Sequence, residues 1–365
     1  LFSLIISWYF KIFVFILISF LFLLLFFNIF IKYNKFFLSI GSILLVVILI
    51  EVLYPYIPSQ YNKTLNAYYD ENSGYMQRTY RDWIKGLGFV PRAGIYDSKK
   101  ISSKGEVVYD VIYSIGKDNF RKSLFNGKAK IHLFGGSFAF GEGLNDNQTL
   151  AYYLWKEHDL KTKNFGVHGY GTHQALFLIE KLNKSSVNGI NLILTGAFHI
   201  RRSACKVSYA HGTPYYENLN GLASLKGYCI LKDNFFVKVL NKSNISKLYY
   251  KIFLKYGANS DEDIINYLSI MKSIKKNTKE NNSSLVIAYI ATDETYFKNT
   301  TYSNKKFFQE LSKIPDKIIN VSLTKNYSTI ERKYYIHPLD KHPSALANKE
   351  RAKILAPLLK NTLLN

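Results

Sequence analysis

Two segments of this chain carry residue types that together could perform nucleophilic acyl chemistry. Ser137 follows Gly135 and Gly136 directly after a short apolar run, and Asp340 and His342 lie one residue apart near the end of the chain. A carboxylate can hold one imidazole nitrogen while the other nitrogen takes the proton of a serine hydroxyl. The residue types therefore predict an acyl-transfer site if the fold brings the two segments together.

Each segment also has a plainer interpretation. Ser137 could cap a helix after a glycine turn, and Asp340 and His342 could be ordinary capping and surface residues before the last helix. His337 lies three residues before Asp340 and is a rival for the base. We prefer His342, because Pro343 fixes the loop as it enters that helix.

A glycine-rich segment, 164–171, is the second candidate loop. Its three glycines allow a tight turn that presents a backbone N–H to a ligand, although an ordinary strand–helix turn has the same composition. His168 and His173 lie in or beside it, but no second pair at ligand spacing accompanies them. We therefore expect no metal site.

Other catalytic templates do not fit. Ala139 occupies the position that a G-x-S-x-G elbow requires for glycine, and no phosphate-binding loop is present. Glu142 and Asp146 could be imagined as a glycosidase pair, but acidic residues at a helix start explain them more simply.

From residue 128 onward, apolar runs alternate with amphipathic stretches, which predicts a parallel sheet covered by helices on both faces. The expected strands are 129–134, 190–194, 285–290 and 317–321, and the expected helices are 172–182, 261–280, 305–314 and 345–359. Such a sheet places its site at the carboxyl ends of its strands, where the candidate residues fall.

The first 54 residues differ from the rest. Residues 12–31 contain no charge, which is the length needed to cross ~30 Å of hydrocarbon, and residues 36–50 are uncharged again. We expect a transmembrane helical hairpin over 1–54. Lys32 and Lys35 in its turn favour a cytoplasmic turn and an outward-facing remainder. Residues 55–127 then read as a stem with short strands, such as 106–113.

The chain is strongly basic, with 48 Lys and Arg against 26 Asp and Glu among 365 residues. A basic surface suits anionic headgroups or acidic glycans, although a solvated surface is the simpler account. No nucleic-acid module is recognisable, so we expect no nucleic-acid partner. Cys205 and Cys229 could pair in an oxidising compartment, or remain two buried thiols.

Three segments together resemble the SGNH/GDSL hydrolase family over about residues 128–365. The segment 135–143 resembles its nucleophile block, 164–169 its second block, and Asp340 with His342 its closing block. The resemblance implies a three-layer α/β/α sandwich with a flavodoxin-like parallel sheet. It also implies Ser137 as nucleophile, and the N–H groups of Ser137 and Gly169 as the oxyanion hole.

One block departs from the family pattern. Gly196 is followed by Ala, Phe and His199, where the family usually supplies an oxyanion asparagine. His199 is a further candidate donor, and a purely structural histidine is an equal alternative.

The resemblance implies an ester hydrolase without a cofactor or metal, anchored in a bacterial inner membrane with its catalytic domain on the extracytoplasmic side. An acylated envelope glycan or lipid is the expected substrate. An O-acyltransferase would use the same residues, and a catalytically silent envelope-binding protein is the alternative from another class. A membrane protein that donates acyl groups is a further expected partner.

Overall fold

The computed structural model describes residues 42, 45, 46, 48, 49, 67–69, 81–182, 189–207, 210, 212–229, 259–292, 294–323 and 331–364. The chain divides into two compact units, Leu1–Gln60 with Asn234–Lys255, and Tyr61–Asp233 with Tyr256–Asn365. The first unit contributes only five described residues, all helical and all between 42 and 49. The second unit carries the fold and the candidate site.

The predicted membrane hairpin lies outside the described residues, apart from those five, and stays a prediction. Within the ranges given above, no helix has both the length and the apolar character needed to cross a bilayer.

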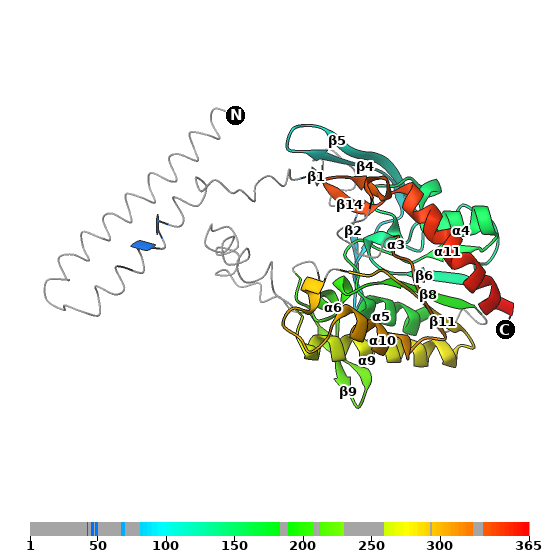
Figure 1. Ribbon diagram of the computed structural model, residues 1–365. Coiled ribbons are helices and arrows are strands. Elements are labelled where there is room, and N and C mark those ends of the chain that lie inside the picture. Colours follow the sequence, from blue (N-terminus) through cyan, green and yellow to red (C-terminus); the bar gives the residue numbers. More distant parts are fainter. Residues whose placement is uncertain are drawn as a thin grey trace, which may run out of the picture. The chain divides into compact units, whose positions relative to one another are not determined.

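A five-stranded parallel sheet forms the centre of the second unit (Figure 1). Its spatial order is β12 (Lys317–Asn320), β11 (Ser284–Tyr289), β8 (Ile190–Thr195), β6 (Ile131–Phe134) and β7 (Thr162–Asn164). All six residues of β8 are buried, as expected for a strand covered on both faces. The prediction of an α/β fold with a parallel sheet is confirmed.

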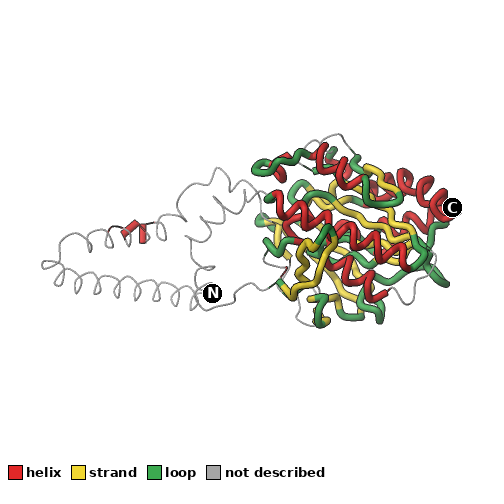
Figure 2. The backbone as a smooth tube through the Cα atoms, turned by 90° about the horizontal axis from the view of Figure 1, so that it is seen from below, coloured by secondary structure: helices red, strands yellow, loops and turns green. Residues whose placement is uncertain are grey.

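Helices cover both faces of this sheet (Figure 2). One face carries α5 (Thr172–Leu182), α6 (Phe198–Ser203), α9 (Asp261–Glu280) and α10 (Asn304–Ser312). The other carries α4 (Leu150–His158) and α11 (Ala345–Leu364).

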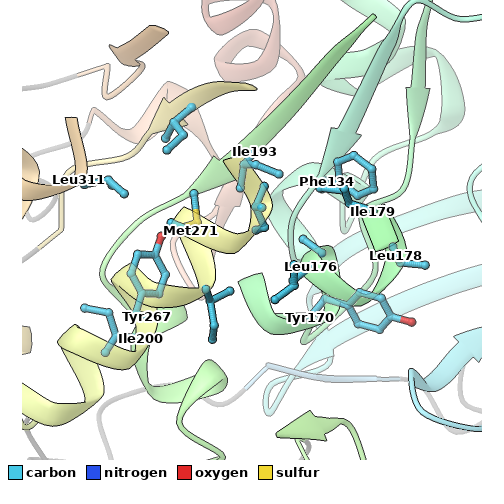
Figure 3. Close-up of a cluster of buried hydrophobic side chains, with 14 of the residues drawn as sticks. Phe134, Tyr170, Leu176, Leu178, Ile179, Ile193, Ile200, Tyr267, Met271 and Leu311 are labelled. Carbon is cyan, nitrogen blue, oxygen red and sulfur yellow. The ribbon is translucent and has the colours of Figure 1, made fainter. Parts of the chain in front are cut away.

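Side chains of each strand alternate between two apolar cores, because successive residues of a strand point to opposite faces. In β8, Ile193 joins the core under α5 and α9, where Met271 and Leu176 also lie (Figure 3). Its neighbours Leu192 and Leu194 join the core under α4 and α11. The second unit therefore has three layers, with the sheet between two layers of helices.

Two of the four expected helices, α5 and α9, have the predicted bounds, whereas α10 begins one residue earlier and ends two earlier than expected, and α11 ends five residues later. The bounds of α9 agree with the expected helix, because Ser260 and Asp263 form a capping box and three acidic residues occupy the first turn. Thr149 caps α4 by accepting from the backbone N–H of Tyr152. The helix α4 was not among the expected helices, although Thr149 is a local signal for its start.

Four small antiparallel units surround the main sheet. They are β1 (Ala67–Tyr69) with β4 (Gly94–Ser102) and β5 (Val107–Ile115); β2 (Arg81–Ile84) with β3 (Gly88–Pro91); β9 (Pro214–Leu219) with β10 (Leu222–Tyr228); and β13 (Tyr335–His337) with β14 (Asp340–Pro343).

The strands expected in a separate stem pack onto the α/β layers. Tyr113 of β5 is fully buried and meets the Phe140 ring edge-on at 5.1 Å between centroids. The inward face of β5 forms a third core with Phe140. The boundary expected at residue 128 is therefore not a break in packing, because the apolar face of β5 needs a partner to bury it.

Cys205 and Cys229 form a disulfide, with their Cα atoms 5.4 Å apart. From the sequence alone, a disulfide and two buried thiols are both possible. The bond joins the end of α6 to the end of β10.

Candidate active site

Ser137 stands where strand β6 turns into the one-turn helix α3 (Ser137–Phe140). Gly135 has a φ of +156°, and a Cβ on it would lie 2.8 Å from the carbonyl oxygen of Leu194, so the turn requires glycine. The helix ends at Gly141 in the left-handed conformation. This turn places the Ser137 hydroxyl at the carboxyl edge of the sheet.

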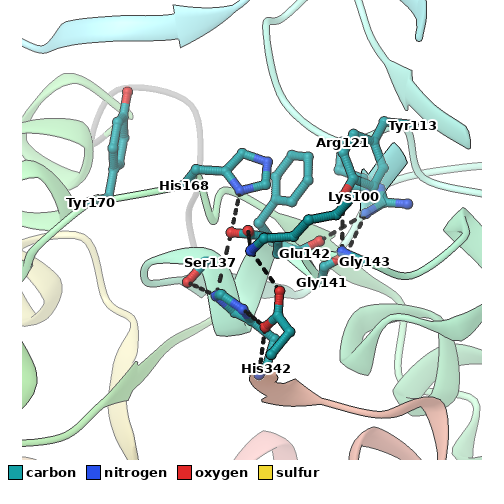
Figure 4. A network of polar contacts seen from close by, with 12 residues as sticks. Lys100, Tyr113, Arg121, Ser137, Gly141, Glu142, Gly143, His168, Tyr170 and His342 are labelled. Atoms are coloured by element: carbon teal, nitrogen blue, oxygen red, sulfur yellow. Dashed lines mark hydrogen bonds and ion pairs between the residues drawn. The ribbon is translucent and has the colours of Figure 1, made fainter. Parts of the chain in front are cut away.

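The structure brings Ser137 and His342 together (Figure 4). Asp340 joins them through the other nitrogen of His342. The Nε2 atom of His342 lies 2.8 Å from Oγ of Ser137, across 205 positions of sequence. Its Nδ1 atom makes a short hydrogen bond to Oδ1 of Asp340, which also accepts from the backbone N–H of His342 at 3.0 Å. A carboxylate at Nδ1 keeps the proton there and leaves Nε2 free to accept the serine proton.

His337, the rival base, points elsewhere. Its Nδ1 accepts from the backbone N–H of Leu339 at 3.2 Å, within the turn that joins β13 to β14. Between the two histidines, it is His342 that contacts Ser137.

The charges around His342 set the protonation of the pair. Burial alone would raise the pKa of Asp340, but hydrogen bonds from His342 and Lys100 outweigh it and lower this pKa to about 2. Burial lowers the pKa of His342, and the carboxylates of Glu142 and Asp340 outweigh burial, so the pKa rises above its usual value. Asp340 therefore stays ionised, and His342 is a stronger base than a free imidazole.

Lys100 reaches the site from β4. Its Nζ lies 2.7 Å from Oδ2 of Asp340 and 3.8 Å from Oε1 of Glu142. Sequence reasoning missed this lysine, because it sits in an ordinary alternating strand far from either carboxylate in the chain. No local pattern identifies it.

Glu142 also belongs to the site. It follows α3, is 6% exposed, and places Oε2 at 2.8 Å from Nδ1 of His168 and 3.3 Å from Nε2 of His342. The interpretation of Glu142 as a helix-start acid is wrong, because the chain leaves α3 at Gly141 and turns the side chain inward. The flanking glycines, Gly141 and Gly143, are the sequence feature that could have pointed to Glu142 as a site residue.

Asp146 interacts with a buried arginine. It opens the short helix η4 (Asp146–Gln148) and accepts from Nε of the buried Arg121 at 2.8 Å. Arg121 also donates to the carbonyl oxygens of Gly141 at 3.0 Å and Leu144 at 2.6 Å. This arginine thus holds the loop that carries Glu142.

The second loop docks against the nucleophile turn. The backbone N–H of Val167 donates to the carbonyl oxygen of Gly135 at 3.2 Å, and Asn164 donates to that of Ala139 at 2.7 Å. Gly169 has a φ of +74°, which favours glycine.

His199 is buried behind the nucleophile turn. Its Nδ1 pairs with Oγ1 of Thr195 at 2.9 Å, and its Nε2 has no hydrogen-bond partner among the described residues. A Cβ on Gly136 would lie 3.1 Å from this Nε2 and would collide with Nη1 of Arg202. Burial, with the charge of Arg202, holds the pKa of His199 well below its usual value, so the ring is neutral.

The cation beside the carboxylates of this site is the ammonium group of Lys100. Glu142, Asp340 and His342 each offer one ligand atom, and these lie within 4.8 Å of one another. The ammonium group of Lys100 already contacts both carboxylates. His173, noted in the sequence, is instead paired through Nε2 with Oγ1 of Thr213 at 3.0 Å.

Comparisons with known proteins are limited to weak structural similarity. No protein-family model and no curated protein matches the chain. Similar solved structures include a lipolytic G-D-S-L protein of Desulfitobacterium hafniense (11% identity, 64% of this chain and 100% of that one, TM-score 0.36). Two others are an acetyl xylan esterase, Est2A, of Butyrivibrio proteoclasticus (12%, 67% and 67%, 0.37) and the esterase EstA of Pseudoalteromonas (14%, 65% and 100%, 0.37). Because these TM-scores lie below 0.5, we take neither family nor activity from them.

Proposed function

We propose that this chain is a serine ester hydrolase of the SGNH/GDSL type. The observation that carries the proposal is the hydrogen-bonded series Ser137–His342–Asp340, in which a buried carboxylate orients an imidazole onto a serine hydroxyl. This arrangement suits covalent acyl chemistry at neutral pH.

In the proposed mechanism, Oγ of Ser137 attacks an ester carbonyl while Nε2 of His342 takes its proton. The same nitrogen then protonates the leaving alcohol, and water reverses the sequence to release the acid. Asp340 orients the ring and stabilises the imidazolium. Each step moves one proton between Ser137, His342 and the bound alcohol or water.

The proposed oxyanion hole uses the backbone N–H groups of Ser137 and Gly169. Each such donor lowers the activation barrier by about 3 kcal/mol. His199 is the proposed third donor, because its Nε2 has no hydrogen-bond partner in the described part of the chain and lies close to Gly136, next to the nucleophile. It would stand in for the asparagine that the sequence lacks at this block.

The proposed substrate is an acylated glycan or lipid of the cell envelope. It rests on the sequence-predicted hairpin in a bacterial inner membrane, the outward orientation and the basic composition. O-acyl transfer to a sugar hydroxyl is the second candidate, with a membrane acyl-donor protein as partner. A catalytically silent binding protein is the competing class, motivated by the missing asparagine.

Turnover of p-nitrophenyl acetate by the full chain tests the enzyme proposal, with Ser137→Ala and His342→Ala alongside. We expect both variants to lose turnover, and a fluorophosphonate probe to label wild-type Ser137. Equal background turnover without labelling would favour the silent binding protein. Adding a glycan acceptor then separates the two enzymes, because only a transferase yields acylated glycan in place of free acid.

A further inference from the structure

Glu142 is a buried carboxylate that the Ser137–His342–Asp340 series does not use. Its Oε2 lies 3.3 Å from Nε2 of His342, the same nitrogen that contacts Oγ of Ser137 at 2.8 Å (Figure 4). The imidazole ring therefore has an acidic side chain beside each of its nitrogens, Asp340 at Nδ1 and Glu142 at Nε2.

The carboxylate distinguishes the two protonation states of His342. In the neutral ring Nε2 carries a lone pair, which a carboxylate oxygen repels. In the imidazolium Nε2 carries a proton, which a carboxylate oxygen accepts. Glu142 therefore stabilises the protonated ring relative to the neutral one.

We propose that Glu142 is a positioning residue that accepts the Nε2–H of the His342 imidazolium and so stabilises the ion pair formed when Ser137 attacks. This deepens the proposed function and rests on it. The proton still passes from Ser137 to His342 and on to the leaving alcohol, and none is transferred to Glu142.

The surroundings hold Glu142 in this place. Nδ1 of His168 lies 2.8 Å from Oε2 and donates to it, because a carboxylate oxygen only accepts. Burial lowers the pKa of His168, so its ring is neutral. Lys100 lies 3.8 Å from the other carboxylate oxygen. The loop itself is held by Arg121 through the carbonyl oxygens of Gly141 and Leu144.

The groups that face His342 shift its pKa in opposite directions. The carboxylates of Asp340 and Glu142 favour its protonated form, whereas the ammonium of Lys100 and burial oppose it. His168 is a neutral neighbour. Removing the charge of Glu142 alone should therefore lower the pKa of His342.

The test compares the full chain with Glu142→Gln, an isosteric change, and with Glu310→Gln, the same change on α10, where the side chain is 39% exposed. The pKa of His342 is followed by NMR with 13Cε1-labelled histidine, its signal assigned with His342→Gln. We expect Glu142→Gln to lower this pKa by about one pH unit. Glu310→Gln should leave it unchanged.

Activity supplies an independent measurement. In Glu142→Gln the acidic limb of the pH profile of kcat/KM should move to lower pH with the pKa, while the alkaline plateau should fall about tenfold. A purely structural role would lower the profile without moving its midpoint. An unchanged pKa of His342 in Glu142→Gln overturns the proposal.

Two further outcomes are decided by the same measurements. Should Glu142→Gln fail to fold by circular dichroism, Glu142→Ala is titrated instead, because it also removes the charge, and a pKa of His342 equal to that of wild type overturns the proposal. Should the wild type show no turnover and no probe labelling, the proposed function fails, while the NMR titration still decides whether Glu142 stabilises the imidazolium.

Discussion

Nζ of Lys100 lies 2.7 Å from Oδ2 of Asp340, although the two residues are 240 positions apart in the sequence. The lysine comes from β4, in the region expected to be a stem, and the aspartate from β14, beside the last helix. The β4–β5 sheet thus supplies a charge to the candidate active site.

Replacing Lys100 with Met should weaken both folding and turnover. It leaves the 4%-exposed carboxylate of Asp340 without its cation, and breaking such a pair costs about 3 kcal/mol of unfolding free energy. Urea unfolding of the full chain measures this loss. Lys99→Met is the matched control, because the neighbouring lysine pairs with the exposed Asp110 at 3.6 Å. Equal losses in both variants would contradict the prediction.

Asp340→Asn should lower kcat/KM by about four orders of magnitude, because the amide no longer enforces the tautomer with a free Nε2. Measured turnover of p-nitrophenyl acetate checks this, with Asp110→Asn as an exposed control. Activity within tenfold of wild type would show that Asp340 does not orient the base.

The carboxylate of Asp340 should also make the unfolding free energy depend on pH in the acidic range. The pKa of Asp340 falls from 3.8 to about 2 on folding, so its contribution of about 2 kcal/mol is complete above pH 4 and is lost as the pH falls toward 2. The unfolding free energy of Asp340→Asn should therefore lie below that of wild type at pH 6, and the gap should narrow by pH 3. Urea unfolding at both pH values measures it, and a constant gap would contradict the assignment.

Arg121→Lys should destabilise the loop that carries Glu142. The guanidinium is 2% exposed, and lies 4.6 Å and 4.9 Å from the ring centroids of Tyr113 and Phe140 while it donates to three backbone carbonyls and Asp146. The ammonium group of a lysine cannot make all of these hydrogen bonds at once. We therefore expect the unfolding free energy to fall by about 3 kcal/mol. Thermal unfolding checks the loss against Lys122→Met, an exposed neighbour.

The disulfide should contribute about 3 kcal/mol, because it closes a loop with a sequence separation of 24. The double variant Cys205→Ser with Cys229→Ser should unfold at a lower temperature by differential scanning calorimetry. Oxidised wild type treated with reductant should approach the same value. A melting temperature unaffected by both changes would contradict this expectation.

Much of the fold could be predicted from local signals. The bounds of α9 follow from its capping box and its apolar spacing, and the buried run of β8 from uninterrupted aliphatic residues. These signals arise from residues a few positions apart, which is why a single sequence displays them. The residues Ser137, Asp340 and His342 could be chosen for the same reason, since each lies in a short segment with glycine or proline beside it.

The sequence alone determined the alternation of strands and helices, the turn that carries Ser137 and the neighbouring positions of Asp340 and His342. Only the tertiary structure decided that Lys100 and Glu142 join them, that Arg121 holds the loop between, and that the β4–β5 sheet packs beside the nucleophile. Those contacts join elements far apart in the chain, and their residue types are common at any solvated surface. Lys100, Glu142 and Arg121 become part of a site because the folded layers bury them and pair their charges.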